Sequence, residues 1–96
     1  MESVPNFAST TELKERLVSL GYEGTIVLEN PDFLSAIIGI DPDGRLIYRY
    51  DLMVEHLMET EGWDYVDAVE FIDYNTVRAI PYMGDMAPII CYSIEE

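Results

Sequence analysis

Basic residues are scarce in this sequence of 96 residues. Five Lys and Arg stand against nineteen Asp and Glu, which gives a net charge of −14 at pH 7. Nucleic acids and anionic membranes are bound through basic surfaces, so we expect the protein to bind neither of them directly. Its charge instead favours a basic protein as partner, because opposite charges steer two surfaces together.

Cysteine is nearly absent, and so are long hydrophobic runs. The single cysteine cannot form an internal disulfide and therefore gives no indication of secretion. The apolar runs extend over only a few residues, far below the ~18 needed to cross a bilayer. The first residues also lack the basic start and apolar stretch of a signal peptide. These absences predict a cytoplasmic protein with no membrane partner.

Motifs that carry chemistry are absent as well. The sequence contains no glycine loop that would cradle a phosphate and no Cys/His set with metal-ligand spacing. His56 is the only histidine, and Cys91 lies among apolar residues, where a thiol is unreactive. The segment 41–44 lacks the further acids of a calcium loop. We therefore predict a protein that is not an enzyme and requires no cofactor.

The composition is that of a small globular protein. Hydrophobic residues make up 49% of the sequence, which is enough for one small core. No repeat or linker divides the chain, so we expect a single domain over residues 1–96 with a loose arm over residues 1–8. The order of predicted elements favours an α+β fold. In it, an antiparallel sheet of about three to four strands carries about three helices on one face.

Three helices are predicted from apolar residues that recur at helical spacing between start and stop signals. They cover residues 10–20, 52–61 and 65–78. Ser9 and Glu12 form a capping-box pattern at the start of the first helix. Asp51 and Asp64 are placed to cap the second and third helices. Pro81 is expected to end the third helix, because proline lacks a backbone N–H.

Four strands are predicted from β-branched or aromatic runs bounded by turn residues. They cover residues 25–28, 33–40, 45–50 and 88–94. Between the second and third runs, Pro42 and Gly44 supply the backbone dihedrals of a tight turn. We therefore expect these two strands to form a hairpin.

Negative charge is concentrated in one part of the chain. Residues 51–73 contain eight acids and no Lys or Arg. At about 100° per residue, the acids of the two helices predicted there fall opposite the apolar side chains. The candidate partner-binding acids are Asp51, Glu55, Glu59, Asp64, Asp67, Glu70 and Asp73.

Two interpretations of this acidic face remain open. It is a solvated face of an acidic protein, or it imitates a phosphate backbone. Carboxylates at i,i+4 lie about 6 Å apart along a helix axis, a spacing similar to that of adjacent phosphates on one strand. Like charges at this spacing destabilise a helix by a few tenths of a kcal/mol per pair, and no Lys or Arg within residues 51–73 offsets that cost.

Tyrosine is abundant, with seven residues of this type. Most are expected in the core or at its edge, each with its hydroxyl group reaching water. Tyrosine is also enriched at the energetic centres of protein interfaces, so some of these residues are candidates for partner contact. We include Tyr74, Tyr82 and the flexible side chain of Met83 in the candidate binding surface.

The stretch EFIDYNTVRAIPY, from Glu70 to Tyr82, is followed by the apolar run 87–90. Together they resemble a family of small acidic uncharacterised bacterial proteins associated with phages and mobile elements. The resemblance covers roughly the second half of the chain and implies no catalytic motif. The context that it implies is similar to that of anti-CRISPR and anti-restriction inhibitors.

The leading hypothesis is an acidic protein-binding inhibitor that mimics nucleic acid. It would block a basic nucleic-acid-binding protein, such as a CRISPR effector or another defence nuclease. The alternative is a non-enzymatic interaction or regulatory module whose acidity serves only solubility. Either protein would be a monomer or a homodimer.

Overall fold

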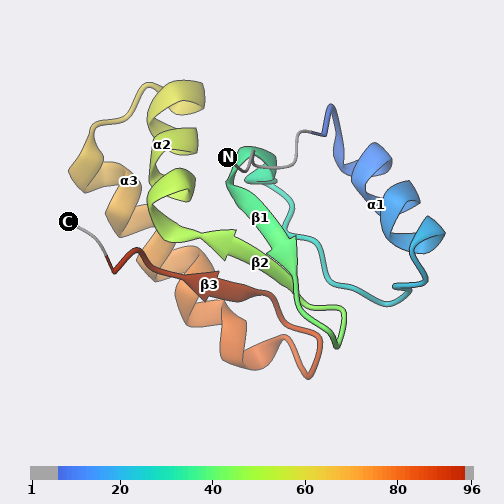
Figure 1. Cartoon of the computed structure of the whole chain (residues 1–96). Coiled ribbons are helices and arrows are strands. Elements are labelled where there is room, and N and C mark those ends of the chain that lie inside the picture. The colour runs from blue at the N-terminus through green and yellow to red at the C-terminus, as the bar shows by residue number, and fades with distance from the viewer. Residues whose placement is uncertain (1–6, 95–96) are drawn as a thin grey trace.

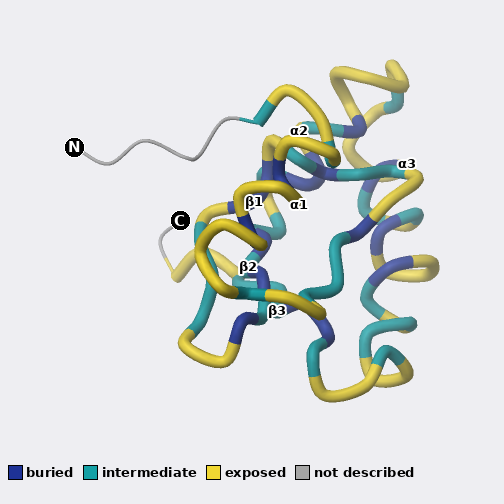
Figure 2. Tube along the Cα trace, turned by 90° about the vertical axis from the view of Figure 1, so that its right-hand side faces the viewer, coloured by how far each residue is buried: buried dark blue, intermediate teal, exposed yellow. Residues whose placement is uncertain are grey.

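A computed structural model describes residues 7–94 of the chain. Within this range the chain forms three α-helices and one three-stranded sheet, which confirms the predicted α+β class. Helices α2 and α3 cover one face of the sheet, and α1 lies beside its β1 edge (Figure 1, Figure 2). Most of the predicted N-terminal arm lies outside the described residues.

Helix α1 runs over Thr10–Ser19, close to its predicted bounds. The hydroxyl of Ser9 accepts a hydrogen bond from the backbone N–H of Glu12 at 3.2 Å, as the capping box requires. The carboxylate of Glu12 accepts from the N–H of Ala8 rather than from that of Ser9, at 2.7 Å. The side chains of Ser9 and Glu12 therefore both hold the start of α1. That of Glu12 binds the N–H of the residue before the predicted one.

Helix α2 runs over Tyr50–Glu61 and begins earlier than predicted. Arg49 occupies the cap position with no side-chain cap, so the prediction that Asp51 caps this helix is wrong. The chain turns into the helix directly from the preceding strand, which leaves Asp51 inside the first helical turn. There its carboxylate lies near the positive end of the helix dipole and 2.9 Å from Nε of Arg49.

Helix α3 covers Tyr65–Phe71, and the side chain of Asp64 caps it by accepting from the N–H of Asp67 at 2.9 Å. The predicted cap is confirmed, but the predicted helix over residues 65–78 is α-helical only as far as Phe71. The chain continues as a π-helical turn over Ile72–Thr76 (η2) and then a 3-10 helix over Val77–Tyr82 (η3).

Pro81 lies inside η3, so the prediction that it ends the helix is wrong. A wider turn precedes it, and the side-chain amide of Asn75 donates to the carbonyl of Phe71 within that turn, at 3.1 Å. The change of helix type keeps Ile72 and Thr76 buried while the helical path continues beyond the last α-helical residue.

The sheet contains β1 (Ile37–Ile40), β2 (Leu46–Arg49) and β3 (Ile89–Cys91), in the order β1-β2-β3. β1 and β2 pair antiparallel, whereas β2 and β3 pair parallel. The sheet is therefore mixed, and the prediction of an antiparallel sheet is wrong in this respect. The helical segment between β2 and β3 returns the chain to the same end of the sheet, and such a crossover produces parallel strands.

The hairpin between β1 and β2 forms as predicted. One carboxylate oxygen of Asp41 accepts from the backbone N–H groups of Asp43 and Arg45, both at 2.9 Å. Gly44 has a φ of 93°, a conformation that side chains disfavour, and a Cβ there would lie 3.1 Å from the ring of Tyr22. The turn therefore needs both the aspartate and the glycine.

The predicted strand over residues 25–28 does not form, and the predicted strand over residues 33–40 forms only in its second half. Residues 25–28 are not in the sheet, because the N–H of Leu28 bonds to the hydroxyl of Tyr48 instead of to a strand. Leu34–Ala36 form a short 3-10 turn (η1) before β1. That turn begins where the carboxylate of Asp32 accepts from the N–H of Leu34 at 3.1 Å.

The core lies between the sheet and the helices. Tyr48 of β2 and Met53 of α2 are completely buried within it. Leu13 and Leu17 bring α1 into the same hydrophobic cluster. This packing leaves the outer sides of α2 and α3 to form a surface.

Candidate interaction surface

The acids of α2 all lie on its exposed side. Asp51, Glu55 and Glu59 are exposed, whereas the buried residues of the helix are Met53, Val54 and Leu57. This distribution confirms the predicted amphipathic pattern of the second helix.

The acids of the third helical segment are exposed as well. They are Asp64 and Asp67 at the start of α3, Glu70 near its end, and Asp73 in η2. Tyr65, the first residue of α3, is 61% exposed. α2 and α3 pack side by side (Figure 1). Glu61, at the end of α2, is exposed as well but lines a separate pocket. We call the other seven exposed carboxylates the acidic helix face: Asp51, Glu55, Glu59, Asp64, Asp67, Glu70 and Asp73.

Little positive charge compensates this face within the described part of the chain. Arg49 is the only cation there that pairs with one of its carboxylates, that of Asp51. Arg78, the one Lys or Arg after residue 50, lies over the ring of Tyr74 at 4.6 Å from its centroid. The negative field of the acidic helix face is therefore almost fully presented to the solvent.

Aromatic side chains border the acidic helix face. The hydroxyl of Tyr50, the first residue of α2, donates to the carboxylate of Asp73 at 2.7 Å. Tyr50 also stacks on Tyr92, with ring centroids 4.9 Å apart. Burial, and then the hydrogen bond to Asp73, raise the pKa of Tyr50 above its usual range, so the hydroxyl remains a donor.

The predicted contact residues at the end of the helical segment differ in exposure. Tyr74 and Tyr82 are 68% and 90% exposed and are available to a partner. Met83 is half-buried and packs against the core. The expectation that most tyrosines lie in the core or at its edge is wrong, since only Tyr48 is buried and four of the seven are exposed.

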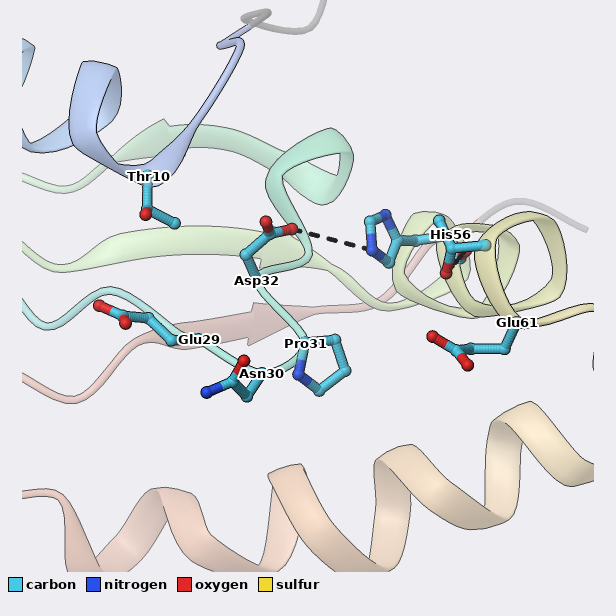
Figure 3. Close-up of a pocket in the computed structure, with 8 residues that line it drawn as sticks. Thr10, Glu29, Asn30, Pro31, Asp32, His56 and Glu61 are labelled. Carbon is cyan, nitrogen blue, oxygen red and sulfur yellow. Dashed lines mark hydrogen bonds and ion pairs between the residues drawn. The ribbon is translucent and has the colours of Figure 1, made fainter.

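A separate polar pocket of about 370 Å³ lies beside His56 (Figure 3). It is lined by Thr10, Glu29, Asn30, Pro31, Asp32, His56, Thr60 and Glu61. Nδ1 of His56 lies 3.1 Å from Oγ of Ser35, and Nε2 lies 3.8 Å from a carboxylate oxygen of Asp32. Neither neighbour is predicted from the sequence, because both lie more than twenty residues before His56 in the chain.

Ser35, His56 and Asp32 are the residue types of a hydrolytic triad, but only the contact between His56 and Ser35 has the length of a hydrogen bond. The distance from Asp32 to the imidazole is too long for a hydrogen bond. The same carboxylate oxygen accepts from the backbone N–H of Leu34. His56 therefore attaches the segment that precedes β1 to α2.

Among residues 7–94 no group of three or more His, Cys, Asp or Glu side chains is placed to hold a metal ion. Cys91 lies half-buried in β3, where it is in register with Arg49 of β2. None of the helices described is both long and apolar enough to cross a membrane.

Comparison of the chain with protein family models, with curated proteins and with solved structures finds no match. The resemblance of the segment from Glu70 to Tyr82 to small acidic proteins of mobile elements therefore stays a prediction.

Proposed function

We propose that this protein is an inhibitor that binds a basic nucleic-acid-binding protein through the acidic helix face and occupies the site of the nucleic acid. One observation carries this proposal. All seven carboxylates of the face are exposed, and within residues 7–94 only Asp51 is paired with a cation. The partner would supply the cations that the face lacks.

The spacing of the carboxylates supports nucleic-acid mimicry. Asp51, Glu55 and Glu59 follow one line of α2, and successive members are about 6 Å apart along the helix axis. Their mutual repulsion costs a few tenths of a kcal/mol per pair in the free protein. A basic groove would relieve this repulsion, so part of the binding energy comes from removing an existing strain.

Apolar side chains exposed beside the acids support an interface over a merely solvated face. Met58 on α2 and Val66 on α3 are 37% and 58% exposed, and Tyr65 at the start of α3 is 61% exposed. They would provide the desolvated contact around which ion pairs form.

The identity of the partner follows from the resemblance to mobile-element proteins. On such an element, the basic protein would be a defence nuclease such as a CRISPR effector, and binding in its nucleic-acid channel would inhibit it. The competing function is an interaction or regulatory module whose acidity serves only solubility. The two functions predict different elution of the bound partner: nucleic acid should displace the partner of a mimic, but not the partner of such a module.

The test uses two variants that carry the same net charge. The acidic-face variant combines Glu55→Gln, Glu59→Gln, Asp67→Asn and Glu70→Gln. These four carboxylates have no hydrogen-bond or ion-pair partner among the described residues. The control variant combines Glu12→Gln, Glu15→Gln, Glu23→Gln and Asp43→Asn. Each variant removes four negative charges and so changes the net charge from −14 to −10.

Each protein is immobilised and exposed to a bacterial lysate at low salt. We expect the parent and the control variant to retain a nucleic-acid-binding protein that a short oligonucleotide then elutes. The acidic-face variant should retain much less of it. A partner that resists both the oligonucleotide and about 0.5 M NaCl would contradict mimicry and favour an aromatic interface.

A further inference from the structure

The Tyr50–Tyr92 stack lies where three segments of the fold meet. Tyr50 begins α2, Tyr92 follows β3, and Asp73 lies in η2. Tyr50 contacts both of the others, through the ring stack and through its hydroxyl. We call these three residues the tyrosine–aspartate site. It combines a carboxylate with an aromatic ring on the border of the acidic helix face.

The outer ring of this site is open to a ligand. One face of the Tyr92 ring is covered by Tyr50, yet the residue is 56% exposed, so the opposite face is accessible. The side chain of Asp73 is exposed as well, although it accepts the hydroxyl of Tyr50. The bond from Tyr50 holds the carboxylate in place next to the stacked rings.

We propose that the tyrosine–aspartate site binds an arginine side chain of the partner, which stacks on the open face of Tyr92 within the negative field of Asp73. This inference rests on the proposed function and names the residue type that the face selects. A guanidinium group is planar and weakly hydrated, so it can lie flat on an aromatic ring. A lysine ammonium group is a compact and strongly hydrated point charge, so it stacks less closely on a ring.

The chain contains a contact of the same kind. The guanidinium carbon of Arg78 lies 4.6 Å from the centroid of the Tyr74 ring, within the range of a cation–π interaction. Both residues are exposed. The pair illustrates how an arginine from outside would lie on the open face of Tyr92.

The experiment compares two synthetic peptides of about ten residues, one of arginine and one of lysine, which carry equal charge. Affinity is measured by calorimetry at low salt for the parent, Tyr92→Leu, Tyr92→Trp and Asp73→Asn. Val18→Ala is the control, because Val18 is 57% exposed and lies on α1, outside the acidic helix face. Circular dichroism confirms that each variant is folded.

The parent should bind the arginine peptide more tightly than the lysine peptide. Tyr92→Leu should reduce the affinity for arginine by about two- to five-fold and change that for lysine much less. Tyr92→Trp should retain the preference, since indole is the stronger cation–π ring. Asp73→Asn should lower the affinity for arginine, and Val18→Ala should leave the preference unchanged.

The outcomes separate this inference from the proposed function. Equal affinities of the parent for the two peptides, or an equal loss of both in Tyr92→Leu, would overturn the arginine site. In that case the acidic helix face would still attract basic partners. Failure of the parent to bind either peptide would contradict the proposed function itself.

Discussion

The backbone N–H of Leu28 donates a hydrogen bond to the hydroxyl of Tyr48, 3.0 Å away in the interior of the protein. The bond ties the irregular segment 25–28 to β2. Tyr48→Phe would remove the acceptor and leave a buried N–H unpaired. We expect the free energy of unfolding to fall by about 1–3 kcal/mol, measured by urea denaturation. Tyr82→Phe, at an exposed position, should change it very little, and an equal effect of the two variants would contradict this role.

The stability of the protein should fall at high pH because of Tyr48. Burial raises the pKa of Tyr48 from 10.0 to about 12. The folded state therefore keeps a proton that the unfolded state loses between these two values. The stabilisation is complete below pH 10 and is lost as the pH rises toward 12. One such group accounts for roughly 1–3 kcal/mol.

Unfolding free energies at about pH 9 and about pH 11.5 test this dependence. Tyr48→Phe starts from a lower stability but should lose less of it over this interval than the parent. Tyr50, whose pKa is also raised, by burial and by Asp73, should produce the loss that remains. Parallel curves for the parent and the variant would show that Tyr48 does not titrate in this interval.

His56 should serve stability and not activity. Both His56→Gln and Ser35→Ala weaken the contact between α2 and the segment before β1. Each should lower the free energy of unfolding by about 0.5–1.5 kcal/mol and leave partner binding unchanged. Thermal unfolding and the binding assay measure the two effects. Loss of biological activity in a folded variant would instead indicate that His56 acts in catalysis.

Salt should stabilise the free protein, because the acidic helix face repels itself. We expect the melting temperature to rise by a few degrees between low salt and about 0.5 M NaCl. The acidic-face variant should have a higher melting temperature than the parent at low salt, and its melting temperature should rise less when salt is added. Comparison of chloride with sulfate separates screening from salting-out. An unchanged or lower melting temperature of the parent in NaCl would contradict a significant role for repulsion.

Local rules in the sequence predict much of this fold. The caps at Ser9 and Asp64 and the turn at Gly44 form as expected, because each depends on groups within about four residues. The segment 25–28 has the composition of a strand, but its bond to Tyr48 comes from a residue twenty positions away. The parallel pairing of β3 likewise depends on the path of the chain between the strands, which no local pattern contains.

The candidate surface also has features that the sequence predicts and features that it does not. Helical periodicity correctly predicts that Glu55 and Glu70 are exposed, since the period is a property of each helix alone. The contact of Tyr50 with Asp73 joins residues 23 positions apart, and that of His56 with Ser35 joins residues 21 apart. No spacing in the sequence indicates either contact. Both require the packing of α2 against its neighbours.

The most direct test of the account is calorimetric titration of the captured partner with the parent, the acidic-face variant and the control variant at low salt. Partly exposed ion pairs contribute about 0.2–1 kcal/mol each, so the loss of four predicts weaker binding by roughly 1–4 kcal/mol in the acidic-face variant. The control variant, with the same net charge, should bind nearly as tightly as the parent. Equal affinities of the acidic-face variant and the parent would contradict the account and would identify the acidic helix face as a solvated surface.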